Sequence, residues 1–127
     1  SEMCIRDRVY AADMKLRVGP DRFYYPDVMV VCDPEDREDY YKTRPCFVAE
    51  VLSPTTEGVD RREKLLAYLE IPDLRGYLLL DSDRPQADYY RRDADGAWWR
   101  EELRGAGVVK VDRLGADLSL DEVYEGL

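Results

Sequence analysis

The stretch that decides the fold is residues 46–81, CFVAEVLSPTTEGVDRREKLLAYLEIPDLRGYLLLD. Its two ends, CFVAEVL (46–52) and GYLLLD (76–81), are short apolar runs typical of strands that are buried on both faces. Between them a helix is predicted from Arg61 to Glu70, and Pro72 ends it. Its apolar stripe consists of Leu65, Leu66, Leu69 and Ile71. A helix between two buried strands predicts a crossover, right-handed by the usual rule, that returns the chain to the same sheet.

The start of this helix carries its own signal. Asp60 is predicted to cap the helix, and Glu63 three residues later completes a pair that resembles a capping box. The helix begins soon after the strand at 46–52, so its first turns are expected to stand near the end of that strand.

The flanking sequence extends the sheet on both sides. Upstream, VYAADMKLRV (9–18) alternates as a strand with one solvated face, and PDVMVVCD (26–33) is typical of a central buried strand. Residues 34–45 form a long acidic and aromatic loop. Downstream, the segments around Asp95-Gly96 predict a hairpin, 108–111 a short strand and 118–127 a terminal helical turn. The prediction is one α/β domain, 9–127, with a mixed β-sheet, a crossover helix and a C-terminal β-hairpin.

The composition excludes several classes of protein. The chain has 127 residues, a net charge of -9 and no His. Without His, Ser-His-Asp and Cys-His catalysis and His-bearing zinc sites are impossible. The negative charge argues against binding nucleic acid through a broad basic face, although an acidic site neutralised by a metal ion stays compatible with it. The sequence has no apolar run of membrane-spanning length, so no membrane partner is expected.

The number of Cys, three, is odd, so a complete intramolecular disulfide framework is impossible, and we expect reduced thiols in a cytoplasmic protein. The first eight residues, SEMCIRDR, do not continue the strand pattern that follows. We interpret 1–8 as a non-native or disordered leader, which would leave the domain truncated at its N-terminus; the alternative is an ordinary frayed terminus.

Two acids lie where a carboxylate is costly. Asp27 begins a buried strand and Glu50 interrupts another. If these strands pair antiparallel across the loop, Asp33 lies near Cys46 and Asp27 lies near Leu52, one or two positions from Glu50. Two carboxylates that share a site repel unless a cation lies between them, and oxygen ligands suit Mg²⁺ or Mn²⁺. The two carboxylates and the backbone carbonyl of Val51 are the predicted metal ligands.

The predicted helix contributes to the same site. Asp60, Lys64 and Tyr68 fall on one stripe at i, i+4 and i+8. The Lys64 ammonium can orient a metal-bound water or stabilise the charge of an attacked phosphate. Asp60 and Tyr68 are supporting candidates, although a helix cap and core packing explain them as well. Glu50 and Lys64 can also be a purely structural salt bridge.

A family resemblance rests on PDVMVV (26–31) followed by AEVLSPTTEGVDRREKLLAYLEIPDLRGYLLLD (49–81). This pattern resembles the bacterial Uma-two family of restriction endonucleases, a branch of the PD-(D/E)XK nuclease superfamily, over residues 9 to about 120. The resemblance implies a restriction-endonuclease-like fold, with Asp27 and Glu50 as metal ligands and Lys64 as the catalytic lysine. Other branches place that lysine two residues after the acid, where this chain has Leu52.

The resemblance also implies that an N-terminal segment which usually packs on this core is missing. The exposed core would then be covered in the full-length form or used to form a homodimer. We expect a cytoplasmic, bacterial, Mg²⁺-dependent endonuclease with DNA as its substrate. Two alternatives remain: an inactive PD-(D/E)XK-like module that binds nucleic acid or protein, and an unrelated α/β structural or regulatory domain. The loop residues Tyr40 and Tyr41, with Lys42 and Arg44, could also stack on bases, although five acids at 33–39 weaken that interpretation.

Overall fold

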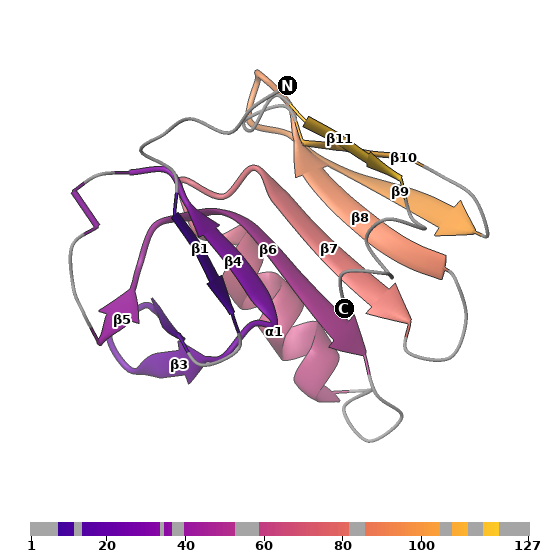
Figure 1. Ribbon diagram of the computed structural model, residues 1–127. Helices are drawn as coiled ribbons and strands as arrows, with labels where there is room; N and C mark the ends of the chain where they lie inside the picture. The colour runs from indigo at the N-terminus through magenta and orange to yellow at the C-terminus, as the bar shows by residue number, and fades with distance from the viewer. Residues whose placement is uncertain are drawn as a thin grey trace.

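The computed structural model describes residues 8–11, 14–33, 35–36, 40–52, 59–81, 86–104, 108–111 and 116–119. Among them, the main sheet has six strands in the order β1-β4-β6-β7-β8-β9 (Figure 1). These strands are β1 (Arg8–Ala11), β4 (Val28–Val31), β6 (Pro45–Leu52), β7 (Gly76–Asp81), β8 (Gln86–Arg92) and β9 (Trp98–Arg104). A smaller sheet has the order β3-β2-β5, with β2 (Lys15–Val18), β3 (Arg22–Tyr24) and β5 (Tyr41–Lys42). A separate ribbon pairs β10 (Val108–Val111) with β11 (Ala116–Ser119).

The segment 46–81 folds as its sequence predicts. Strands β6 and β7 pair in parallel, and helix α1 (Val59–Leu69) connects them. Both strands are buried almost throughout, and each has a neighbouring strand on both sides. The expected antiparallel pairing of β4 with β6 is confirmed, and so is the hairpin of β8 and β9. Gly96 has a φ of 86° in that hairpin turn, a conformation that favours glycine.

The core lies on both faces of the main sheet. On the face covered by α1, Tyr68 of the helix and Ile71 just after it pack with Met29, Val48 and Tyr77 of the strands. The same cluster includes Leu16 and Val18 of β2, so the small sheet helps to close this face. Val30, Phe47, Ala49, Leu78 and Leu80 belong to the cluster on the opposite face.

Four sequence expectations about the elements are corrected. The predicted strand 9–18 is two strands in different sheets, because the chain bends at Met14 and leaves the main sheet. Helix α1 begins at Val59, so Asp60 lies inside the first turn rather than before it. Leu66 is 59% exposed and lies off the apolar stripe, whose buried members in the helix are Ala67 and Tyr68; Ile71 is buried just beyond the helix.

The fourth correction concerns the C-terminal segment. Leu118 and Ser119, expected to begin a helical turn, belong to strand β11, and the rest of 118–127 lies outside the described residues. Of the expected leader, 1–7 likewise lie outside the description, and Arg8 is the first residue of β1.

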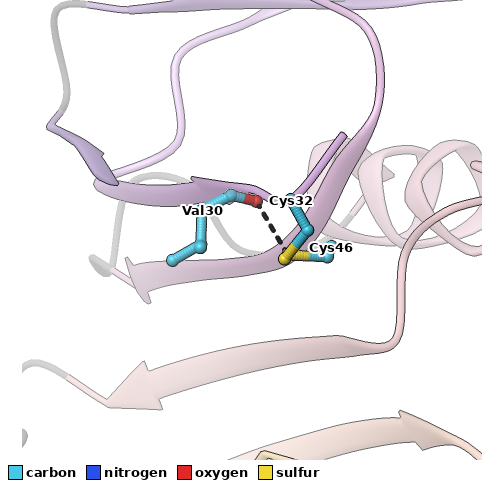
Figure 2. The surroundings of a disulfide bond; sticks show 3 residues. All are labelled: Val30, Cys32 and Cys46. Atoms are coloured by element: carbon cyan, nitrogen blue, oxygen red, sulfur yellow. Dashed lines mark hydrogen bonds between the residues drawn. A yellow bond between two sulfur atoms is a disulfide. The ribbon is translucent and has the colours of Figure 1, made fainter. Parts of the chain in front are cut away.

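Cys32 and Cys46 form a disulfide, contrary to the expectation of reduced thiols (Figure 2). The pairing of β4 with β6 shifts between Val30 and Val31, and just beyond this irregularity the two Cα atoms are 5.8 Å apart. That separation is normal for a disulfide. The Cys46 sulfur lies 3.4 Å from the carbonyl oxygen of Val30. The composition could not reveal the pair, because only the strand register brings these two residues together.

Candidate functional site

The register of β4 and β6 brings Asp27 beside Glu50. Val28 pairs with Ala49, and Met29 pairs with Val48. Continued by one residue, this register sets Asp27 opposite Glu50, two positions from the predicted partner Leu52. Residues directly opposite each other in an antiparallel pair project from the same face. The register therefore sets Asp27 level with Glu50 rather than with Leu52.

Glu50 is the only acid among the buried residues of the described chain, with 5% of its surface exposed. Three side chains donate hydrogen bonds to its carboxylate. The Tyr68 hydroxyl donates to Oε1 at 2.7 Å, whereas Lys64 Nζ and the Tyr77 hydroxyl both donate to Oε2 at 3.3 Å. An unpaired carboxylate at this depth would be strongly destabilising, so these donors explain how the protein tolerates it.

Asp27 lies just before β4 and is held by the backbone of β6. The Val51 amide donates a hydrogen bond to Asp27 Oδ2 at 2.7 Å. This contact ties the Asp27 carboxylate to the residue that follows Glu50, at the C-terminal end of β6. The contact that the structure shows for the Val51 backbone is therefore made by its N–H, whereas the sequence analysis named its carbonyl as a ligand.

Lys64 reaches the site from α1. Its side chain is 25% exposed and forms an ion pair with Glu50. Its ammonium also lies 5.9 Å from the centre of the Tyr24 ring, a cation–π contact that links the helix to β3. Lys64 thus lies at the boundary between the buried carboxylate and solvent, where a group can contact both Glu50 and an incoming ligand.

Tyr68 is fully buried on the same helical stripe. Burial raises the pKa of its hydroxyl far above the usual range, and the negative charge of Glu50 raises it further. The phenol therefore stays protonated and acts as a hydrogen-bond donor rather than a proton acceptor. Its ring makes edge contacts with Tyr24 at 5.2 Å and Tyr77 at 4.8 Å between ring centres.

Tyr77 is the residue of this site that sequence reasoning missed. It is the second residue of β7, and the sequence shows it only as part of a buried strand. The signal that could have found it is the parallel register, in which Val48 pairs with Tyr77 and Glu50 with Leu79. Tyr77 and Glu50 therefore project from one face of the sheet, two residues apart.

Asp60 is the remaining candidate named from the sequence. Asp60 lies in the first turn of α1, and its side chain is outside the described residues. Asp81 ends β7 opposite Leu52 and accepts a hydrogen bond from Gln86. Within the described ranges, no group of three or more Asp, Glu, His or Cys side chains is arranged to hold a metal ion.

A shallow hollow lies on the same sheet face, beyond α1. Leu52, Leu79 and Asp88 line it, together with Arg100 and Glu102 of β9. Leu79 is the cross-strand partner of Glu50, so the hollow begins one strand away from the buried carboxylate. Arg100 forms ion pairs with both Asp88 and Glu102, at 3.2 and 3.1 Å.

No helix in the described part of the chain is long and apolar enough to cross a membrane.

Comparisons with known proteins agree with the fold. A putative nuclease belonging to DUF820 from Anabaena variabilis, solved by crystallography, superposes with a TM-score of 0.70 and 19% sequence identity. The match covers 94% of this chain and 68% of that structure, and at this identity it shows a shared fold. Two Synechocystis proteins are similar in sequence, the uncharacterized proteins slr1290 and sll1609. The first is 36% identical over 118 residues and the second 34% identical over 101 residues.

The matched part of the chain covers 91% of its length in the first comparison and 76% in the second, and spans 62% and 57% of those two relatives. A family model matches residues 2–122, which is nearly the whole chain. Its description is "Putative restriction endonuclease". The chain belongs to the Uma2 family.

Proposed function

We propose that this protein is a divalent-metal-dependent DNA endonuclease, with Asp27, Glu50 and Lys64 as its catalytic residues. The observation that carries the proposal is the ion pair of Lys64 with a buried Glu50 at the strand end where Asp27 also lies. The family description and the nuclease named in the fold comparison support the same reaction class. Residues 9–127 would act as one domain, on DNA in the bacterial cytoplasm.

The two carboxylates suit a hard cation such as Mg²⁺ or Mn²⁺. Each carboxylate offers about four lone-pair directions. Glu50 uses three of them for described donors, and Asp27 uses one for Val51. The remaining oxygen positions, with the carbonyl of Val51 and waters, make an oxygen-only ligand set. A bound Mg²⁺ would supply charge stabilisation at the attacked phosphate and a more acidic water.

The protein side chains have separate tasks in this proposal. Tyr68 and Tyr77 hold Glu50 in one orientation, which fixes the direction of its free lone pair. Lys64 provides a positive charge at the mouth of the site, where the phosphate would carry its developing charge. Because the Tyr68 hydroxyl keeps its proton, Tyr68 supports the carboxylate and takes no proton from water.

One observation favours the alternative of a non-cleaving binding module. The donors on Glu50 satisfy most of its hydrogen-bonding capacity within the protein, as expected of a purely structural carboxylate. In that case the two carboxylates would bind no metal, and the family's fold would serve to bind nucleic acid or protein alone.

Nicking of supercoiled plasmid decides between these readings. The parent protein is expected to nick DNA with Mg²⁺ or Mn²⁺ and to stop on addition of a chelator. Asp27→Asn and Glu50→Gln should lose both Mn²⁺ binding, measured by calorimetry, and nicking. Asp95→Asn, which alters an exposed turn residue, is the matched control and should retain both activities. Sedimentation of the same samples tests the expected homodimer. A folded parent that binds no Mn²⁺ would overturn the metal-dependent mechanism.

A further inference from the structure

We propose that the outer face of the small sheet binds unpaired nucleic-acid bases next to the active site. This aromatic–basic face consists of Lys15, Arg17, Phe23 and Tyr41, with the exposed Tyr25 one residue beyond β3. The inference rests on the proposed function for the identity of the polymer, DNA, and adds a binding site with a preference for single strands. The site is separate from the carboxylate centre and uses different residues.

The strand register creates this face. Arg17 pairs with Phe23 across β2 and β3, and Lys15 pairs with Tyr41 across β2 and β5. Side chains alternate between the two faces along each strand. The intervening residues Leu16 and Val18 are buried, which leaves the cations and rings together on the outer side.

The contacts within the face interleave positive charges with rings. The Lys15 ammonium lies 5.0 Å from the centre of the Phe23 ring, and the Arg17 guanidinium lies 5.6 Å from that of Tyr41. The Phe23 and Tyr41 rings are 6.5 Å apart, edge to face. Neither cation forms an ion pair with a carboxylate in the described part of the chain.

Exposure makes the rings available to a ligand. Phe23 is 47% exposed and Tyr25 is 55% exposed, although both are large and largely apolar. Aromatic rings beside cations are what proteins use to bind single-stranded nucleic acid, because bases stack on the rings while phosphates meet the charges. A duplex keeps its bases stacked on each other, so it offers this face only its backbone.

The charge of the chain strengthens the choice of occupant. The protein carries a net charge of -9, so an outer face with two cations that lack described carboxylate partners is a local exception. Such a face attracts a polyanion more readily than an acidic second copy of the same chain. Lys42 and Arg44, the loop cations that the sequence suggested for nucleic-acid binding, instead have partners within the protein. Lys42 is buried and donates to the carbonyl of Asp36, and Arg44 pairs with Asp33.

Strand β3 connects this face to the carboxylate centre. Tyr24 lies between the two exposed rings in sequence, and its own ring contacts Tyr68 and Lys64. Tyr25 is two residues before Asp27, roughly 7 Å along an extended chain. A base stacked on Tyr25 would therefore belong to a nucleotide close to the proposed scissile phosphate.

Binding without cleavage tests the face directly. Fluorescence anisotropy in chelator would compare a labelled single-stranded oligonucleotide with a duplex of equal length. The parent is expected to bind the single strand more tightly. Phe23→Leu and Tyr25→Leu should each weaken single-strand binding about tenfold and leave duplex binding nearly unchanged. Phe23→Tyr, which keeps an aromatic ring, should retain the parental affinity for the single strand.

The matched control is Trp99→Leu, which removes another exposed ring, on β9. It should bind the single strand as the parent does, and melting temperatures check that each variant is folded. Equal affinity of the parent for both oligonucleotides, or parental affinity in both leucine variants, would overturn the proposal. So would a parent dimer that Phe23→Leu dissociates without loss of single-strand affinity, because the face would then be a subunit interface.

The two proposals fail in different ways. A parent that prefers single strands through Phe23 and Tyr25 but never nicks DNA leaves the binding face standing and removes the endonuclease. A parent that nicks plasmid but shows no dependence on these rings removes the face alone.

Discussion

The Tyr68 hydroxyl donates a hydrogen bond of 2.7 Å to Glu50 Oε1, and both side chains are almost completely inaccessible to solvent. The helix that carries Tyr68 thus contacts, inside the core, a carboxylate that interrupts an otherwise apolar strand. The contact serves two ends at once. It compensates a buried charge, which stabilises the fold, and it fixes the orientation of that charge, which matters for the proposed catalysis.

Tyr68→Phe should therefore destabilise the fold more than Tyr77→Phe does. Loss of a hydrogen bond to a charged group costs about 1.5–3 kcal/mol, and the Tyr68 contact is shorter than the 3.3 Å contact of Tyr77. Urea unfolding of the two variants and the parent measures the difference, since both substitutions keep the ring. A larger loss for Tyr77→Phe would show that the Tyr77 hydroxyl is the main partner of Glu50.

The Cys32–Cys46 disulfide predicts a redox-dependent stability. It closes a loop with a sequence separation of 14, for which the loss of chain entropy in the unfolded state gives about 3 kcal/mol. Denaturant unfolding of the parent should show this loss on addition of a reductant. Cys32→Ser is expected to have the stability of the reduced parent, and addition of a reductant should not change it. If thiol titration of the purified protein finds both cysteines free, the bond does not form in solution.

The lowered pKa of Asp93 predicts that the stability of the β8–β9 hairpin decreases at acidic pH. A hydrogen bond from the Trp99 indole N–H lowers the pKa of the Asp93 carboxyl, and the backbone amides of Ala97 and Asp95 lower it further. Since the pKa of the folded state lies below the ordinary value of 3.8, the stabilisation is complete above that value. It is lost as the pH falls through the lower pKa of the folded state.

Tryptophan fluorescence between about pH 6 and about pH 2 should report this transition, because the Trp99 indole contacts the carboxylate directly. Asp93→Asn is expected to remove the transition. Asp95→Asn, which changes an exposed carboxylate in the same turn, should retain it. An unchanged transition in Asp93→Asn would mean that another acid controls the signal.

The sequence was sufficient to predict those elements whose own residues show the periodicity of a strand or the residues of a turn. The predictions for the run GYLLLD and for the Asp95-Gly96 hairpin match the structure, because short buried strands and tight turns are determined by residues close together in the sequence. It was insufficient where distant strands must be aligned. The split of 9–18 between two sheets, the disulfide and the contact of Tyr77 with Glu50 all depend on register. Apolar alternation is the same whether a strand stays in one sheet or leaves it.

The expected partnership of Glu50 and Lys64 is present, but the same ion pair serves both the catalytic and the structural interpretation. Lys64→Ala separates them. As a catalytic group, the ammonium stabilises the attacked phosphate, and its removal should cost roughly 10²–10³ in nicking rate. Mn²⁺ binding should stay close to parental, because the two carboxylates would hold the ion and removal of a nearby positive charge does not weaken that attraction. Lys64→Arg, which keeps the charge, is the matched control and should retain part of the rate.

As a purely structural partner, Lys64 would matter for folding alone. Breaking a buried ion pair typically costs about 3–5 kcal/mol. Here Glu50 keeps the hydroxyls of Tyr68 and Tyr77 as donors, and Lys64 is itself 25% exposed, so we expect a smaller loss of stability. Melting temperature, Mn²⁺ affinity and plasmid nicking, measured on one preparation of each variant, distinguish the two roles. A Lys64→Ala protein that is much less stable yet nicks DNA at the parental rate would remove the lysine from the mechanism.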